Sequence, residues 1–287
     1  IMNTPHSAIL HMHIDTNPQS EQMGDESMLR TLAHQANAIW PQERPLFDRY
    51  ALEGAVKILD LGCGSGEITR RLAQRYPQAR LLGIDILEGP LAHARATNLD
   101  LGERVRFATG DAFALALPDA EFDLVVCRHL SQSVPGFPRV LAQIDRVLRP
   151  GGWLHLLSED YAMLQLPQDV GAPDDFWQRT VLEFIAAQGC DGRIGRHTPP
   201  LVRALRYTDL RVDYAVVDTE RVPRATFAGI LRAWGDGFSA ALAEASGQAL
   251  EQVQARFAAM VAAVEDPDRY AVWHVPIISA RKPGASA

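Results

Sequence analysis

The chain has 287 residues, with 28 Lys and Arg against 35 Asp and Glu, and a formal net charge of −7. This length can bury one α/β core and leaves roughly a hundred residues for a lid or cap. An acidic chain without a run of Lys or Arg lacks the basic face that phosphate binding needs, which argues against nucleic acid as a partner.

The residue pattern in the N-terminal part of the chain, residues 1–54, predicts an arm followed by a helical lid. Residues 1–15 contain three histidines and little periodicity, and are interpreted either as vector-derived or as a flexible arm that closes over a site. Between residues 27 and 40, apolar side chains recur at helical spacing, as in Met28, Leu32 and Ala36. A second short helix is expected over 44–52.

From residue 56 the hydrophobic period changes, and strands alternate with helices. Strands are expected at 56–61, 80–85, 105–108, 122–127 and 153–157, with helices at 67–75, 89–101 and 139–148. This alternation is typical of a parallel sheet covered by helices on both faces. Such a sheet binds its ligand beyond the carboxyl ends of the strands, near the point where the strand order reverses.

After residue 160 the regular alternation ends. The pattern predicts helices at 172–188 and 199–207, a strand at 211–221, helices at 227–245 and 250–264, and a last strand at 270–281. We interpret residues 55–287 as the main domain. The segments 161–200 and 224–265 are interpreted as insertions into it that cap a substrate pocket.

A glycine-rich turn follows the first strand directly and leads into a helix. It reads Asp60-Leu61-Gly62-Cys63-Gly64-Ser65-Gly66. Glycines let a backbone bend sharply and approach a ligand, and the helix behind them offers free N–H groups. A tight turn without a ligand is the alternative. The dinucleotide fingerprint has a different spacing, Gly-x-Gly-x-x-Gly, although an acid at the end of the next strand, such as Asp85, suits both readings.

Five motifs stand in order over about residues 55–160: the turn at 60–66, Gly83-Ile84-Asp85, Gly110-Asp111-Ala112, the strand at 122–126, and Leu148-Arg149-Pro150-Gly151-Gly152. Together they resemble the class I S-adenosylmethionine (SAM)-dependent methyltransferase family. The resemblance implies a Rossmann-like seven-stranded α/β sheet whose last strand is antiparallel. It also implies transfer of a methyl group to an O, N, S or C atom of a small molecule.

The same resemblance implies which residues bind the cofactor. The turn after the first strand would hold the methionine part of SAM through Asp60, Gly62, Gly64 and Gly66. Asp85 would accept hydrogen bonds from both ribose hydroxyls, and Ile86 would pack on the adenine. Asp111 would accept from the adenine amino group, with Ala112 and Phe113 beside the ring; alternatively, Asp111 only caps the following turn. The product would be S-adenosylhomocysteine.

Methyl transfer requires an aligned nucleophile and removal of its proton. His129, just beyond the fourth strand, is the candidate base because imidazole titrates near neutral pH. Glu159 and Asp160 follow the fifth strand and could hold an acceptor amine or hydroxyl. Each of the three also fits a structural or solvated position. The segment 127–129, at the end of the fourth strand, has no acidic side chain that could bind a metal ion. No metal site is therefore predicted.

Aromatic residues in the later part of the chain allow two readings. Phe176, Trp177, Phe227, Trp234 and Phe238 could wall an apolar substrate pocket, or they could be ordinary core packing.

Two other functions stay open: an NAD(P)-dependent oxidoreductase, and a SAM-binding regulator without catalysis. The three widely spaced cysteines favour free thiols over disulfides or structural zinc, as in a reducing cytoplasm. No apolar run reaches the length of a membrane span, so we expect a cytoplasmic protein without a membrane partner. We expect a monomer or homodimer.

Overall fold

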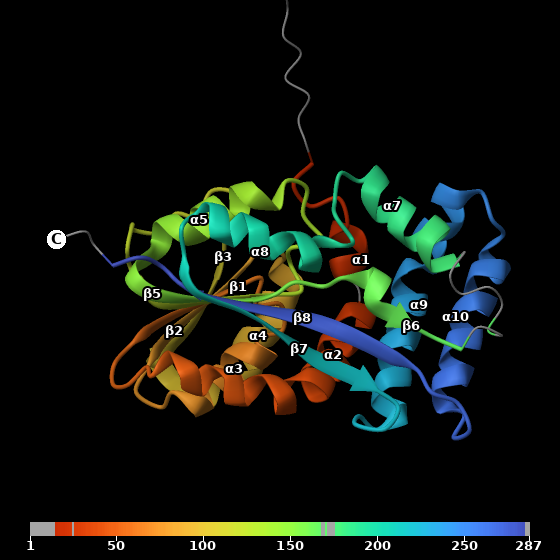
Figure 1. The fold of residues 1–287 in the computed structure, drawn as a ribbon, viewed down its shortest axis with the longest axis horizontal. Coiled ribbons are helices and arrows are strands. Elements are labelled where there is room, and N and C mark those ends of the chain that lie inside the picture. The colour runs from red at the N-terminus through yellow and green to blue at the C-terminus, as the bar shows by residue number, and fades with distance from the viewer. Residues whose placement is uncertain (1–14, 25, 168–169, 171–175, 285–287) are drawn as a thin grey trace, which may run out of the picture.

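The computed structural model describes residues 15–24, 26–167, 170 and 176–284. All but the last residue of the predicted arm at 1–15 therefore lies outside the described residues. Within them, strands and helices alternate through the first half of the chain, and additional helices follow (Figure 1).

The sheet has the strand order β3-β2-β1-β4-β5-β8-β6, with β7 paired to β8. Its strands are β1 (Lys57–Leu61), β2 (Arg80–Asp85), β3 (Val105–Thr109), β4 (Phe122–Arg128), β5 (Leu148–Leu157), β6 (Leu164–Gln165), β7 (Thr208–Asp218) and β8 (Val272–Arg281). The first five are parallel, and β8 runs antiparallel to both β5 and β7. The predicted α/β sheet with an antiparallel last strand is confirmed, and the two-residue β6 is an addition.

Helices cover both faces of this sheet (Figure 1). On one face lie α3 (Glu67–Arg75) and α4 (Glu88–Thr97); on the other lie α5 (Phe137–Val147) and α8 (Ile194–Ala204). In α5 the buried side chains recur at spacings of three and four residues, which turns one apolar stripe toward the strands. The predicted helix at 89–101 ends earlier, at Thr97, where the side chain of Asn98 bonds the carbonyl of Ala94; a short 3₁₀ helix, η2 (Leu99–Arg104), follows.

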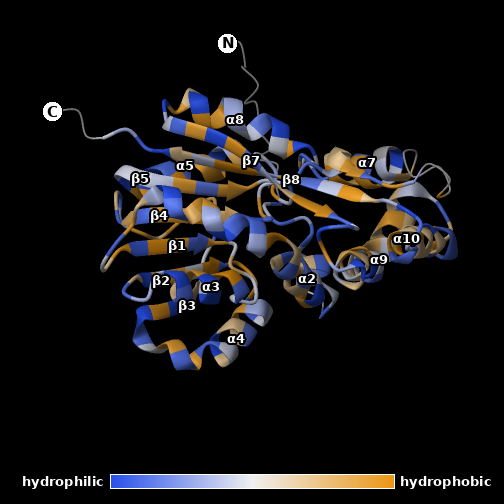
Figure 2. Cartoon of the chain, turned by 60° about the horizontal axis from the view of Figure 1, so that its bottom comes forward, coloured by the Kyte–Doolittle hydropathy of each residue, from blue (hydrophilic) through white to orange (hydrophobic). Residues whose placement is uncertain are grey.

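The remaining helices form a second group, which is in contact with the strands β7 and β8. It contains α1 (Ser20–Gly24), α2 (Glu26–Glu43), η1 (Arg44–Tyr50), η3 (Tyr161–Met163), the π-helical η4 (Trp177–Val181), α7 (Leu182–Ala187), α9 (Arg224–Ser246) and α10 (Leu250–Glu265). Helix α9 packs against both α2 and α10, and α2 also contacts β7. Figure 2 shows hydrophobic residues concentrated in the strands and on the inner sides of these helices. Gly247, with φ of +69°, ends α9 near the predicted break.

The structure differs from the predicted cap at 161–200. Helix α8 begins at Ile194 rather than at 199, and its Ile194 and Val202 belong to the same hydrophobic cluster as α5 and the sheet. The end of that segment is therefore part of the α/β layers. Of the predicted helix at 172–188, residues 171–175 lie outside the described residues, and 177–187 are helical. No helix of the described ranges is long and apolar enough to cross a membrane.

Candidate functional site

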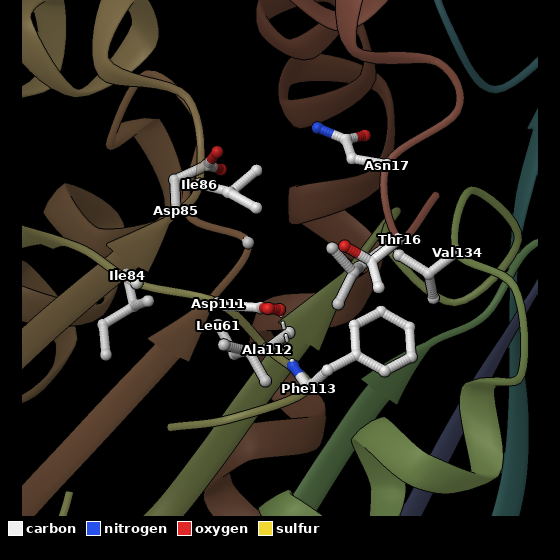
Figure 3. A pocket seen from close by; sticks show the side chains of 13 residues that line it. Thr16, Asn17, Leu61, Ile84, Asp85, Ile86, Asp111, Ala112, Phe113 and Val134 are labelled. Carbon is white, nitrogen blue, oxygen red and sulfur yellow. Dashed lines mark hydrogen bonds between the residues drawn. The ribbon is translucent and has the colours of Figure 1, made fainter. Parts of the chain in front are cut away.

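A pocket of about 380 Å³ lies where the carboxyl ends of β1, β2 and β3 meet, next to the point of strand-order reversal between β1 and β4. Asp85 ends β2 and Ile86 follows it, and Asp111, Ala112 and Phe113 follow β3; all five line the pocket (Figure 3). A further part of the wall comes from Thr16, Asn17, Leu130 and Val134. We call this the first pocket.

The carboxylate of Asp85 is fixed by the backbone on two sides. Its Oδ2 accepts from the N–H of Gly64 at 2.8 Å, and its Oδ1 accepts from the N–H of Leu87 at 3.0 Å. Burial raises the pKa of Asp85, and these N–H groups oppose that effect. Each carboxylate oxygen can accept a second hydrogen bond, so Asp85 can still hold a pair of hydroxyl donors.

The three glycines of the turn after β1 have positive φ angles, between +50° and +76°, which L-residues rarely adopt. Their surroundings differ. Gly62 lines the first pocket, whereas a Cβ on Gly64 would meet the side chain of Leu32 at 2.7 Å, and one on Gly66 would meet Phe107. The glycines therefore serve a tight turn packed under α2, and only Gly62 of the three reaches the pocket wall.

Asp60 is buried beneath this turn and is not part of the described wall of the first pocket. Its Oδ2 accepts from the hydroxyl of Thr69 at 2.6 Å, which ties β1 to α3. Burial raises the pKa of Asp60 to about 6.

Asp111 also bonds to the backbone nearby. Its Oδ1 accepts from the N–H of Phe113 at 2.8 Å, the dashed line in Figure 3. Asp111 therefore stabilises the turn, as the second reading expected, and it also lines the first pocket, whereas its contact with an adenine amino group stays a prediction.

His129 and Glu159 form a buried pair. The Nδ1 of His129 lies 2.5 Å from Oε1 of Glu159, which also accepts from the amide of Gln35 at 3.2 Å. The Nε2 of His129 and Oε2 of Glu159 are both buried without a hydrogen-bond partner in the described structure. His129 has φ of +56°, a strained conformation for a residue with a side chain, and such strain concentrates at functional sites. We call this pair the dyad.

The carboxylate of Asp160 is occupied by structural partners. It pairs with the guanidinium of Arg196, whose Nε lies 2.5 Å from Oδ2, and it accepts from the N–H of Ala162 at the start of η3. Asp160 is also fully buried and does not line the first pocket, so this arrangement gives no support to the predicted direct catalytic role of Asp160.

A second buried ionic cluster lies at the end of α2 and was not predicted from the sequence. Glu43 Oε1 is 2.9 Å from both Nε of Arg128 and Nε2 of His155, and His155 Nδ1 is 2.6 Å from the hydroxyl of Tyr50. Burial opposes ionisation of Glu43, but Arg128 and His155 outweigh it and lower its pKa to about 2. This cluster fixes the end of α2 to β4 and β5, directly beside His129.

The sequence contained a signal for these residues. Gln35 stands three residues after Leu32, and Glu43 stands three after Trp40, so both fall on the apolar face of α2. A polar residue on such a face is buried and must have a partner.

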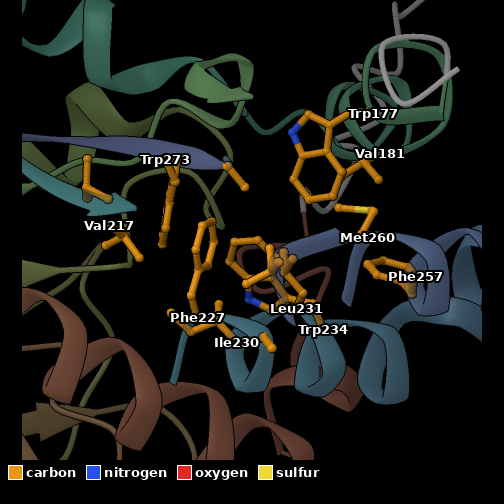
Figure 4. Packing of buried hydrophobic residues seen from close by; sticks show 14 of the residues in the cluster. Trp177, Val181, Val217, Phe227, Ile230, Leu231, Trp234, Phe257, Met260 and Trp273 are labelled. Carbon is orange, nitrogen blue, oxygen red and sulfur yellow. The ribbon is translucent and has the colours of Figure 1, made fainter. Parts of the chain in front are cut away.

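A separate pocket of about 410 Å³ lies among the added helices and is lined mainly by aromatic side chains. Trp177, Trp234 and Phe238 belong to its wall, whereas Phe176 and Phe227 pack within the surrounding core (Figure 4). Each of the two readings therefore holds for some of the aromatic residues: three line a pocket, and two pack in the core. We call this the aromatic pocket.

The first pocket fits an adenosyl group. Asp85 offers acceptors for a ribose diol, and Ile84, Ile86 and Phe113 provide an apolar surface for a flat ring. In the part of the chain that the structure describes, no group of three His, Cys, Asp or Glu is placed to hold a metal ion.

Comparison with known proteins agrees with this arrangement. Residues 58–152 match a family model described as a methyltransferase domain. The chain is 44% identical over 98 residues to a trans-aconitate 2-methyltransferase of Deinococcus radiodurans, covering 34% of this chain and 36% of the relative. It is 32% identical over 172 residues to a trans-aconitate 2-methyltransferase of Azoarcus sp. strain BH72 (60% and 62%), and 40% identical over 109 residues to a demethylmenaquinone methyltransferase of Thermus thermophilus (38% and 50%). The chain thus covers between 36% and 62% of these relatives.

Solved structures show the same fold. A phosphoethanolamine N-methyltransferase 2 of Haemonchus contortus, in complex with S-adenosylhomocysteine, superimposes with a TM-score of 0.61 at 16% identity, over 94% of this chain and 61% of that one. A structure titled the [4+2]-cyclase SpnF gives 0.55 at 22% identity, over 95% and 99%. The fold alone therefore does not name the reaction. The resemblance noted above therefore has support over residues 58–152, which match the methyltransferase domain model and lie in a sheet with the strand order β3-β2-β1-β4-β5.

Proposed function

We propose that this chain is a SAM-dependent methyltransferase that methylates an O, N, S or C atom of a small-molecule acceptor. The observation that carries the proposal is that a buried His129–Glu159 dyad adjoins a wall residue of the first pocket along the chain. His129 immediately precedes Leu130, a wall residue of that pocket, and holds an unpartnered buried Nε2. The relatives' names refer to different acceptors, so they support the reaction type rather than one substrate.

In this proposal Asp85 holds the ribose, Ile86, Ala112 and Phe113 enclose the adenine, and Asp111 accepts from its amino group. Gly62 lies against the methionine part of SAM; Gly64 and Gly66 shape the turn behind it. Asp60 acts from beneath the turn, by holding it to α3 through Thr69. SAM, when bound, supplies a methyl group on a positively charged sulfur.

The dyad supplies the base. In the neutral imidazole, the Nδ1–H of His129 donates to Glu159, so the lone pair lies on Nε2. That nitrogen can accept the acceptor's proton, and the resulting imidazolium is stabilised by the buried carboxylate. Two features speak against a dinucleotide enzyme: β8 is antiparallel, and Leu32 occupies the space over Gly64 that a pyrophosphate would need.

The test is calorimetric titration of the full chain with S-adenosylhomocysteine and, separately, with NADH. We expect S-adenosylhomocysteine to bind and NADH to bind at least about tenfold more weakly, a difference of about 1.4 kcal/mol. Tighter binding of NADH would overturn the proposal. Turnover in a radiolabelled methyl-transfer screen separates an enzyme from a regulator. Because Cys63, Cys127 and Cys190 are free thiols, which suit a reducing compartment, we place the reaction in the cytoplasm. We further propose a monomer or homodimer that acts without nucleic acid.

A further inference from the structure

The aromatic pocket has a chemistry that differs from that of the first pocket. Its largest wall residues are aromatic and come from five different elements: Tyr161, Trp177, Phe184, Trp234, Phe238 and Phe257. Trp177 and Trp234 stack with ring centroids 5.8 Å apart, and Tyr161 meets both rings edge-on (Figure 4 shows the two tryptophans). Among the described residues of this wall, none carries a formal charge, and Gln19 is the one amide.

Each pocket has a wall residue that stands close to a member of the dyad in the sequence. Leu130, next to His129, belongs to the first pocket, and Tyr161, two residues after Glu159, belongs to the aromatic pocket. Burial and the nearby Glu159 carboxylate raise the pKa of Tyr161 well above its usual value, so it stays a neutral phenol. The N-terminal segment also joins the two sites, because Asn17 lines the first pocket and Gln19 lines the other. Tyr161 therefore links the wall of the aromatic pocket to the Glu159 carboxylate of the dyad.

The wall selects against charge. A carboxylate or phosphate held there would lose its hydration and gain no opposite charge from the described wall, which costs several kcal/mol. An ammonium group would regain about 2 kcal/mol from the aromatic faces, which is less than the cost of its lost hydration. Flat or branched apolar groups instead gain from burial against aromatic faces.

We infer that the aromatic pocket is the acceptor site and that the acceptor is an uncharged, mainly apolar hydroxy compound of the phenol or enol type. This inference rests on the proposed function. In the reaction, the O–H bond breaks and its proton goes to Nε2 of His129. The oxygen pair forms the new O–CH₃ bond, and the S–CH₃ bond breaks with its electron pair on sulfur. The products are a methyl ether and a neutral thioether, and the imidazolium later releases its proton to water.

The experiment uses full-length protein saturated with S-adenosylhomocysteine, titrated calorimetrically with three probes. 2-Naphthol is the apolar phenol, trans-aconitate the anion, and 2-phenylethylamine the cation on an apolar body. We expect 2-naphthol to bind at least about tenfold more tightly than either charged probe. Equal or tighter binding of trans-aconitate or 2-phenylethylamine overturns the inference. If S-adenosylhomocysteine itself does not bind, the proposed function fails instead, so the two failures are distinguishable.

Matched variants locate the binding site. Phe238 and Phe184 are half-buried wall residues, so a charge at either position can reach water and the chain can still fold. Phe238→Glu and Phe184→Glu are each expected to weaken 2-naphthol binding at least about tenfold, while Phe238→Leu keeps it within about threefold. Tyr270→Glu, on an exposed residue outside the pocket, is the control. S-adenosylhomocysteine affinity should stay unchanged in all four. Unaltered 2-naphthol binding in both Glu variants would show that the probe binds elsewhere.

Discussion

The backbone N–H of Gly64 donates to Oδ2 of Asp85 across 2.8 Å, so the turn after β1 and the turn after β2 position each other. One carboxylate thereby has two tasks in the proposed function. It anchors the glycine turn, and its remaining lone pairs point to ligand hydroxyls. Substitutions at Asp85 should therefore affect more than a single hydrogen bond.

Asp85→Ala is expected to weaken S-adenosylhomocysteine binding by about 1–3 kcal/mol, because the ribose hydroxyls lose their acceptor and the turn loses its anchor. Calorimetry measures the change. Glu88→Gln is the control, since Glu88 is an exposed acid three residues away that pairs with Arg95. Unchanged affinity in Asp85→Ala would contradict the assignment of the ribose site.

His129→Ala is expected to lower the methyl-transfer rate by about 10²–10⁴-fold while leaving S-adenosylhomocysteine affinity within about twofold. Glu159→Gln should also lower the rate, and the double variant should lose little more than His129→Ala, because the two residues act as one unit. His197→Ala is the matched control, since this histidine is exposed and pairs with Asp191. Full activity in His129→Ala would remove the base from the mechanism.

Glu43→Gln is expected to reduce the free energy of unfolding by about 3–5 kcal/mol, because it leaves the buried Arg128 guanidinium without its counter-charge. Asp100→Asn, which removes an exposed partner of Arg70, should change the stability far less, because solvent screens this pair. Urea unfolding near neutral pH measures both. The pKa of Glu43 is lowered from 4.5 to about 2, so its stabilisation is present above about pH 4.5 and is lost as the pH falls toward 2. Similar losses in the two variants would mean that the Glu43 cluster is not a stabilising unit.

Asp60 should have the opposite pH dependence. Its pKa is raised from 3.8 to about 6 by burial, so the protonated form favours folding. Its contribution is complete below about pH 4 and is lost as the pH rises through 6. Asp60→Asn keeps an acceptor for Thr69 and removes this titration. Relative to the parent chain, the variant should gain about 1–3 kcal/mol in stability between about pH 5 and pH 7.5, measured by urea unfolding. A constant difference over that range would argue against a raised pKa.

Local patterns in the sequence were sufficient for the α/β sheet and most helices, whereas the antiparallel direction of the last strand was implied by the family resemblance. Strand and helix periods and glycine turns act over a few residues, and the order of the five motifs narrows the possible topologies. Helix α3 lies at 67–75 as predicted, because a glycine turn fixes its start and Pro77 lies just beyond its end. Helix boundaries differ from the predicted ones where contacts with a neighbouring element set them. Helix α8 is an example, because its first turn packs against the sheet.

The sequence by itself determined that Asp85 and Asp111 end neighbouring strands, since parallel strands bring their carboxyl ends to one edge. Only the tertiary structure decided which polar residues behind them work together. It paired His129 with Glu159, held Asp160 against Arg196 and placed Gln35 and Glu43 under the site. These partners are 30 to 124 residues apart along the chain. Their contacts depend on how α2 and α8 dock onto the sheet, which is set by packing of whole surfaces rather than by any local pattern.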